Sequence, residues 1–242
     1  MLIVGIETSS TQVSCALGGP DGVLAASQVN RGQRHAELLS PMIGQLCAAA
    51  GVSLDSVNAV AVGVGPGLFT GLRVGLATAK AMAFGLGVPV IGVGSLELVA
   101  FPVRFAPCRI VAVTDARRSE VFWARFSGGM DGVEAFGPSQ VGSPAELRAE
   151  LDAELDADGA GAGHLLVGDG ALRYREVLAA DGVEFANSAL AHPSAWALVQ
   201  VARSRASVSS TVPPQDVHPV YLRQPDAEAN WVQRPTSEAP RS

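Results

Sequence analysis

The chain has 242 residues, of which 48% are hydrophobic and 17% are charged, and its net charge is −6. This length and composition exclude a disordered chain and predict a globular protein with a sizeable core. The negative charge argues against broad binding to nucleic-acid backbone, so that any contact with RNA would be local or supplied by a partner.

The residues that carry chemistry form none of the common catalytic or metal-binding patterns. The three cysteines are far apart and form no CxxC pair, which argues against a disulfide framework and a thiolate zinc site. The histidines form no HxxxH or HExxH pair, and no serine lies in a GxSxG elbow. The N-terminus lacks a basic segment before an apolar run, and the uncharged stretches contain Gly-Pro breaks. We therefore expect a cytoplasmic protein with reduced thiols and no membrane span.

Three short apolar strands are expected near the start of the chain, at residues 2–7, 13–17 and 23–29. They are joined by tight polar turns, and such consecutive strands predict an antiparallel meander. Residues 34–50 follow as an amphipathic helix, whose apolar side carries leucines and a methionine.

The stretch from residue 57 to 93 predicts a buried strand, a glycine-rich turn, a helix and a second buried strand. Thr70 is expected to cap the helix over 71–86, and Gly87 is expected to end it. Because this helix is apolar nearly all round, it must be covered on both sides. Either it is buried within its own domain, or its ridge of small residues packs against a partner; the ridge consists of Gly71, Gly75, Ala79 and Ala83.

The pattern of the first hairpin returns in the second half of the chain. An apolar strand at 109–114, a polar turn at 115–119 and a strand at 120–126 repeat the order at 2–17. We interpret this repeat as an internal duplication into two similar halves. Later elements are helices expected at 144–155, 172–180 and 194–204, and a strand at 164–167.

The C-terminal part of the chain differs from the rest in composition. From about residue 207 the periodicity is lost, and Pro, Ser, Gln and acidic residues become frequent. The apolar segment at 220–223 is expected to dock on the body, whereas 225–242 is expected to be disordered.

Two turns, a Gly-Asp-Gly segment and one loop are candidate anion sites. The turn that begins Glu7-Thr8-Ser9 either presents hydroxyls and backbone N–H groups to a phosphate or is an ordinary hairpin turn. A similar turn at Asp115 favours the phosphate interpretation, since two facing hairpins can hold a phosphate between them. The Gly-Asp-Gly segment around Asp169 either lies against a nucleotide or starts a helix. The loop at 65–71 lacks the Gly-Lys-Ser/Thr of a Walker A loop and the spacing of a dinucleotide fingerprint.

Several segments together resemble the TsaB (YeaZ) family. They are Gly5-Ile6-Glu7-Thr8-Ser9, residues 34–43, the run from Gly65 to Lys80, Asp115-Ala116-Arg117, residues 167–170 and residues 219–223. The run from Gly65 to Lys80 together with Asp115-Ala116-Arg117 is the specific part of this match, which reaches from the N-terminus to about Arg223.

The resemblance implies an α/β protein with the actin-like ASKHA fold, in which each of two lobes is led by a β-hairpin or meander. An N-terminal lobe is expected at 1–104, a C-terminal lobe at 105–224 and a disordered tail at 225–242. It also implies a role in forming threonylcarbamoyladenosine beside the tRNA anticodon. In that system the similar TsaD-type paralogue transfers the threonylcarbamoyl group, and a TsaE-type ATPase joins the pair.

The resemblance implies a partner protein without catalytic residues of its own. TsaD-type chains carry a metal-binding HxxxH just after the strand equivalent to 88–93, and the two positions here are Ser95 and Val99. The chain would bind the catalytic paralogue, or a second copy of itself in isolation, through helices 34–50 and 71–86, and would meet tRNA only within the complex. The expected interface residues are His35, Leu38, Leu39, Met42, Leu46, Gly71, Leu72, Gly75, Leu76, Ala79 and Ala83.

The alternatives are a kinase or ATPase of the same fold acting on small molecules and, with less support, a peptidase. The first would bind nucleotide in a cleft lined by Glu7, Thr8, Ser9, Asp115 and Asp169. Glu7 stands where ATP-using members of the wider fold usually have Asp, which weakens this alternative. In the partner interpretation no cofactor is required, although ATP or ADP can bind within the complex.

Overall fold

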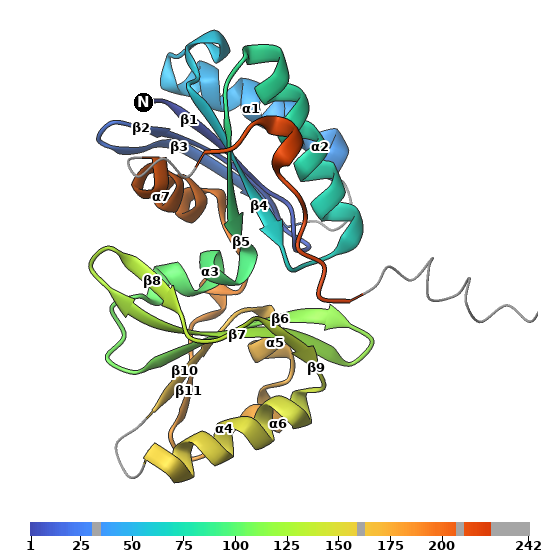
Figure 1. Ribbon diagram of the computed structural model, residues 1–242, viewed down its shortest axis with the longest axis vertical. Coiled ribbons are helices and arrows are strands. Elements are labelled where there is room, and N and C mark those ends of the chain that lie inside the picture. The colour runs from blue at the N-terminus through green and yellow to red at the C-terminus, as the bar shows by residue number, and fades with distance from the viewer. Residues whose placement is uncertain (31–34, 159–162, 207–210, 224–242) are drawn as a thin grey trace, which may run out of the picture.

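The computed structural model describes residues 1–30, 35–158, 163–206 and 211–223. They form two lobes, each built on a mixed β-sheet, and the two lobes stack along the long axis of the molecule (Figure 1). The expected tail at 225–242 lies outside the described residues. Among the helices that the structure describes, none is long and apolar enough to cross a membrane.

The first sheet has the strand order β3-β2-β1-β4-β5. Strands β1 to β3 form the expected antiparallel meander, and β4 and β5 continue the sheet in parallel with β1. The strands are β1 (Ile3–Glu7), β2 (Val13–Gly19), β3 (Gly22–Val29), β4 (Ala59–Gly65) and β5 (Val90–Gly94).

The second sheet repeats this topology. Its order is β11-β10-β6-β7-β8, so an antiparallel meander again continues through two parallel strands, and β9 pairs with β7. The internal duplication that the hairpins predicted is therefore present in the fold. The strands are β6 (Arg109–Arg117), β7 (Glu120–Gly129), β8 (Gly132–Ala135), β9 (Gln140–Gly142), β10 (His164–Val167) and β11 (Val183–Phe185).

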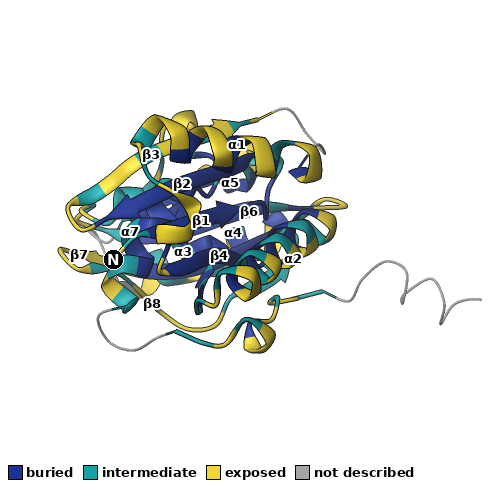
Figure 2. Ribbon diagram, turned by 90° about the horizontal axis from the view of Figure 1, so that it is seen from above, coloured by how far each residue is buried: buried dark blue, intermediate teal, exposed yellow. Residues whose placement is uncertain are grey.

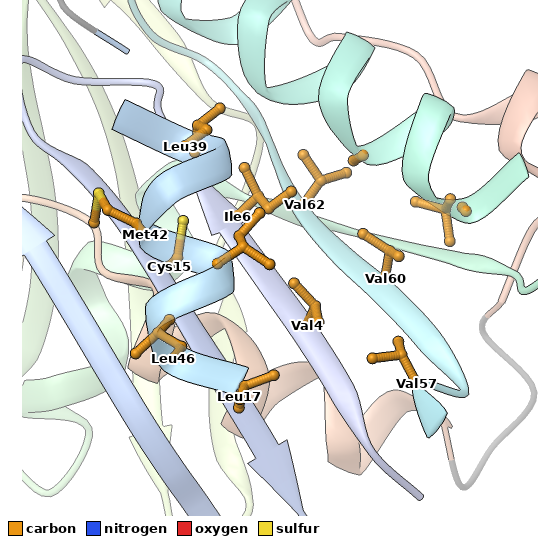
Figure 3. Packing of buried hydrophobic residues seen from close by; sticks show 14 of the residues in the cluster. Val4, Ile6, Cys15, Leu17, Leu39, Met42, Leu46, Val57, Val60 and Val62 are labelled. Carbon is orange, nitrogen blue, oxygen red and sulfur yellow. The ribbon is translucent and has the colours of Figure 1, made fainter. Parts of the chain in front are cut away.

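Helices α1 (His35–Ala50) and α2 (Phe69–Leu86) cover one face of the first sheet. Figure 3 shows Leu39 and Leu46 of α1 in one buried cluster with side chains of the first sheet, among them Ile6, Leu17 and Val62. Burial of these apolar side chains stabilises the lobe by about 25 cal/mol per Å² of surface removed from water, and it fixes both helices on their own lobe.

The helix α7 (Ala195–Ala206) covers the opposite face of the first sheet, although it follows the strands of the second lobe in sequence (Figure 1). Its Leu198 and Val199 belong to one buried cluster with Ile3 and Ile91 of the first sheet. The assignment of 105–224 to a C-terminal lobe is therefore wrong for this helix, because its apolar side needs the first sheet for burial.

Helix α3 (Ser95–Ala100) makes the reciprocal crossing. It follows β5 of the first sheet but packs on β6 of the second, and it lies between the lobes in Figure 1. The second lobe has its own helices, α4 (Pro144–Asp158), α5 (Asp169–Arg173) and α6 (Arg175–Leu178). The short 3₁₀ segments are Leu54–Ser56, Phe101–Val103, Ser188–Leu190 and Pro214–Asp216.

The segment 211–223, here called the C-terminal strap, returns to the first lobe. Val212 forms an antiparallel bridge with Val90, Val217 is buried in the first core, and the Val220 N–H donates to the Val64 carbonyl over 2.7 Å. The strap therefore packs mainly on the first lobe, although its sequence position assigned it to the second, and only its end at Leu222 packs on the second core.

The start of α2 differs from the expectation. The helix begins at Phe69, so Thr70 lies inside the first turn and is exposed, and the N-cap residue is Leu68, whose side chain makes no capping bond. The end agrees with the expectation, because Gly87 adopts a left-handed conformation with φ 66°.

Candidate functional site

The turn after β1 serves the fold of its own lobe. Glu7 is fully buried, and its Oε1 accepts the Ser9 N–H over 2.5 Å while its Oε2 lies 3.5 Å from the Ser95 hydroxyl. Burial raises the pKa of Glu7, and the hydrogen bonds from Ser9, Thr8 and Ser95 oppose this rise. A Cβ at Gly63 would overlap the carboxylate, which shows how closely the sheet surrounds it.

The next residues of this turn fix the start of α2. The Thr8 hydroxyl donates to the Gly71 carbonyl over 2.8 Å, and the Leu68 N–H donates to the Ser9 carbonyl over 2.7 Å. Thr8 is buried and lines neither of the two spaces between the lobes that are described below. Of the expected cleft residues, Glu7 and Thr8 are therefore occupied by structural contacts.

The other three expected cleft residues meet between the lobes. The Asp115 N–H donates to Asp169 Oδ1 over 3.0 Å, and Ser9, Asp115 and Asp169 line one narrow space of about 10 Å³. Such a space holds about one water molecule. Asp115 itself is held by Arg173 and Arg117, whose Nη1 atoms lie 3.0 and 3.4 Å from its Oδ2.

Asp169 is mostly buried beside this space. Burial raises its pKa and the nearby Asp115 charge adds to this effect, whereas the Asp115 N–H and His192 lower it. The predicted phosphate turns are thus brought together, but in this conformation they enclose no room for a nucleotide.

A larger cavity of about 590 Å³ opens beside this narrow space. The first lobe contributes His35 and the loop at 66–71, the second lobe contributes the tip of the β6–β7 hairpin, and the strap forms a third wall. Among the described lining residues there is no acidic side chain, and the cavity is cationic and aromatic in character; the residues that give it this character are Arg117, Arg118, Arg223, Phe69, Phe122 and Tyr221.

Neither Arg118 nor Arg223 was expected at a site from the sequence alone. Arg117, Arg118 and Ser119 all have positive φ, of 66°, 54° and 60°. A tight hairpin usually carries Gly or Asn at positions with positive φ. The two consecutive arginines in this polar turn are therefore a feature of the sequence that could have indicated a functional site. Arg223 reaches the second lobe through a 2.5 Å contact with Glu120, and the strap thereby closes one side of the cavity.

The expected interface residues lie mainly inside the first lobe. All except Leu38, which is half-buried, are buried against the sheet or the adjoining turn. The assignment of the Gly71–Ala83 ridge to a partner is therefore wrong, because Gly71 and Gly75 pack directly on Thr8.

Another side of α2 points away from the first sheet and is exposed. We define the outer face of α2 as Arg73, Ala77, Ala81 and Phe84, which are exposed, with Phe84 81% exposed. Figure 2 shows exposed residues along the outer sides of α1 and α2, while β1, β4 and β6 are mostly buried. The exposed residues of α1 next to it are small or polar, among them Pro41, Gly44 and Ala48.

Comparison with known proteins gives consistent results. The family described as TsaD, tRNA N6-adenosine threonylcarbamoyltransferase, matches residues 29–231. The TsaB protein of Escherichia coli, a tRNA threonylcarbamoyladenosine biosynthesis protein, is 29% identical over 98% of this chain and 100% of its own length. An uncharacterised protein of Mycobacterium tuberculosis is 34% identical over 93% of both chains.

Solved structures agree with these matches. YeaZ from Pseudomonas aeruginosa is 27% identical, superposes with a TM-score of 0.79, and the match covers 91% of this chain and 99% of that one. The ethanolamine utilization protein EutJ from Carboxydothermus hydrogenoformans shares the fold alone. It is 9% identical and superposes with a TM-score of 0.50, and the match covers 83% of this chain and 90% of that one. The two repeated sheets are those of the actin-like ASKHA fold, and the chain belongs to the family whose description is TsaD and, by its full-length relatives, to the TsaB (YeaZ) family.

Proposed function

We propose that this chain is a non-catalytic partner of a TsaD-type transferase and takes part in forming threonylcarbamoyladenosine on tRNA. The observation that carries the proposal is the outer face of α2. Ala77 and Ala81 leave a smooth surface on which another helix can pack closely, and Phe84 projects from its end. An exposed aromatic residue beside small residues is typical of a protein–protein interface.

Two further residues support a partner without its own transferase centre. Ser95 and Val99, at the positions where TsaD-type chains carry histidines, are both buried, and the Ser95 hydroxyl accepts the Gly65 N–H over 3.2 Å. A serine already bonded within the fold and a core valine offer no imidazole to a divalent metal.

The same face would serve a second copy of the chain when the paralogue is missing. Because this face cannot bind the paralogue and a second copy at the same time, the paralogue would displace the second copy from the homodimer. In this proposal a TsaE-type ATPase joins the pair, and tRNA is met through the complex, in keeping with the net charge of −6.

The direct test is size-exclusion chromatography of this protein mixed with the TsaD-type protein of the same cell. We expect a shared larger peak for the wild type and separate peaks for Ala81→Arg, since a long charged side chain would stand in the middle of the interface. Ala153→Arg is the matched control, because Ala153 is exposed on a helix of the other lobe. Co-elution of Ala81→Arg with the paralogue would place the interface elsewhere.

A second candidate, nucleotide binding, is favoured by the 590 Å³ cavity. Guanidinium groups suit phosphate oxygens, and aromatic side chains suit a planar base. We propose that ATP or ADP would bind there, beside Arg118 and Phe122, rather than in the narrow space next to Asp169. Calorimetric titration of both nucleotides into the isolated protein and into the complex tests this. Equal binding by wild type and Arg118→Glu would contradict the assignment.

A further inference from the structure

The C-terminal strap is fixed to the first lobe along most of its length. Val212 and Val90 exchange two backbone hydrogen bonds of 2.9 Å, and the Lys80 ammonium group donates to the Gln215 carbonyl over 3.3 Å. Val217 is buried in the first core. These contacts attach the strap to β5 and to α2.

Tyr221 ties the end of the strap to the first lobe. Its ring centroid lies 5.3 Å from that of Phe69, and the Arg73 guanidinium carbon lies 3.8 Å from the centre of the Phe69 ring. Arg73 also donates from Nε to the Tyr221 hydroxyl over 3.4 Å. Because neighbouring aromatic rings and a cation above one of them attract each other, Tyr221 moves together with α2.

The two residues that follow Tyr221 contact the second lobe instead. Leu222 packs on the buried cluster that contains Phe122 and Phe126. Arg223 Nη1 lies 2.5 Å from Oε2 of Glu120, the first residue of β7. Within three consecutive residues, the strap therefore passes from one lobe to the other.

The helices that the two lobes exchange lie on the other side of the molecule. There, Trp196 of α7 packs on Phe101, which follows α3, with ring centroids 6.2 Å apart, and Arg205 of α7 pairs with Glu97 of α3 over 2.7 Å. Figure 1 shows α7 and the end of the strap on opposite sides of the junction between the lobes. The exchanged helices thus form one edge of this junction and the strap forms the other, where it lines the 590 Å³ cavity.

The two edges differ in how deeply their contacts are buried. Phe101 is 7% exposed, and the apolar side of α7 is buried against the first sheet. The side chains of Arg223 and Glu120 are 30% and 36% exposed, and Leu222 is half-buried. Because water replaces an exposed ion pair at little cost, the strap edge is the one that separates first.

We propose that Leu222 and Arg223 form a releasable clasp, which holds the two lobes closed on the cavity and lets them open about the exchanged helices when it is released. Hinge closure of two domains needs only a few residues that change conformation, and the two chain crossings supply them here. The clasp is independent of the proposed function, since it requires neither the paralogue nor a nucleotide.

The first test measures the distance between the lobes by double electron–electron resonance on the full chain. Spin labels on Ser40→Cys and Ala145→Cys report on α1 and α4, where both residues are exposed. Cys108→Ser removes the partly exposed native thiol, and the other two cysteines are buried. We expect one main distance in this protein and a second, longer distance in its Arg223→Glu variant, because two carboxylates would then face each other. The same distances in both proteins would overturn the clasp.

A charge swap shows whether the ion pair itself is responsible. Glu120→Arg alone should also give the longer distance. Glu120→Arg combined with Arg223→Glu should restore the short one, since the attraction returns with its charges exchanged. Arg175→Glu is the matched control, because Arg175 is exposed and stacks on Phe185 of its own lobe. A double variant that stays open would contradict the pairing of Glu120 with Arg223.

Leu222→Ala tests the apolar half of the clasp. This variant keeps the ion pair but loses the side chain that packs on the second core, so we expect the longer distance again. Val220→Ala is the comparison, because Val220 precedes Tyr221 and is 43% exposed, and it should keep the short distance. The short distance in both variants would contradict the role of Leu222.

Thiol labelling then reports whether release of the clasp opens the cavity. Ala116 lines the cavity and is 2% exposed, so an Ala116→Cys thiol in the Cys108→Ser background should react slowly with a maleimide. It should react several-fold faster when Arg223→Glu is added, and the charge swap should slow it again. Thr70→Cys on the exposed rim is the control, whose rate should be the same in all three backgrounds. Equal rates for Ala116→Cys with and without Arg223→Glu would show that the lobes do not separate at the cavity and would overturn the proposal.

Discussion

Gly75 of α2 packs directly on Thr8 of the first hairpin turn, and the two residues leave no room for a side chain between them. A Cβ at Gly75 would overlap Thr8 Oγ1, the same hydroxyl that donates to the Gly71 carbonyl over 2.8 Å. The small residues of α2 thus leave space for a polar turn of the same lobe. The Thr8 hydroxyl of that turn donates a hydrogen bond to a carbonyl of the helix.

Gly75→Ala should therefore destabilise the isolated protein. The added methyl group must displace either Thr8 or the helix, and overpacking of this kind costs roughly 1–3 kcal/mol. Urea unfolding of the purified protein, followed by circular dichroism, measures the change in the free energy of unfolding.

Gly85→Ala is the matched control on the same helix. A Cβ at Gly85 has open space around it, and Ala is favoured over Gly in a helix by about 0.5–1 kcal/mol. We expect this variant to be at least as stable as the wild type. Equal stability of the two variants would show that the contact with Thr8 can relax without cost.

The spacing of Gly71, Gly75, Ala79 and Ala83 predicted a closely packed ridge, and the structure confirms close packing. The sequence could not show what the ridge packs against, because periodicity fixes which residues share a helix face but not which distant segment covers it. The covering residue, Thr8, is more than sixty positions away from Gly71 and Gly75. For the same reason the apolar side of α7 predicted burial but not burial on the first sheet.

The local elements and the repeated hairpins could be predicted because alternation of apolar residues and turn chemistry act over a few residues. The cavity could not be predicted, because it forms where three separate segments meet. Arg118 faces it only through the pairing of β6 with β7, and Arg223 only through the return of the strap. Ser9, Asp115 and Asp169 do meet, whereas Glu7 turned out to be buried beneath its own turn.

Glu7→Gln should change how stability depends on pH. Because folding raises the pKa of Glu7, its favourable contribution is present below its ordinary value of 4.5 and is lost as the pH rises through the raised value. Glutamine has no such titration. Relative to the wild type, the variant should therefore become more stable between acid and neutral pH in parallel urea titrations. A constant difference across this range would mean that Glu7 stays charged without cost.

Val217→Ala should show that the strap is part of the first core. Val217 is buried against the first lobe, and removal of two methyl groups there costs roughly 2 kcal/mol, from about 0.8 kcal/mol per buried group with a small cavity term. Val220→Ala is the control, since Val220 is 43% exposed and should change stability by less than about 0.5 kcal/mol. Thermal melts of both variants give the comparison, and equal losses would contradict the burial of the strap.

Arg125→Ala should be among the most damaging changes in the second lobe. The Arg125 side chain is 9% exposed and lies 2.7 Å from Glu150 Oε2 and 2.6 Å from Glu154 Oε1. Its loss removes the cation that these two glutamates share, although Arg109 still lies 3.4 Å from Glu154. Removal of one partner from a buried ion pair costs about 3–5 kcal/mol, towards the lower end here because both glutamates are partly exposed. Arg148→Ala is the comparison, because Arg148 on α4 is more exposed than Arg125; it pairs with Asp152 and donates to the Ala179 carbonyl, contacts whose loss costs about 1–2 kcal/mol together. Urea unfolding of the two variants should separate them clearly. Similar small losses would mean that water reaches the Arg125 cluster and compensates its charges.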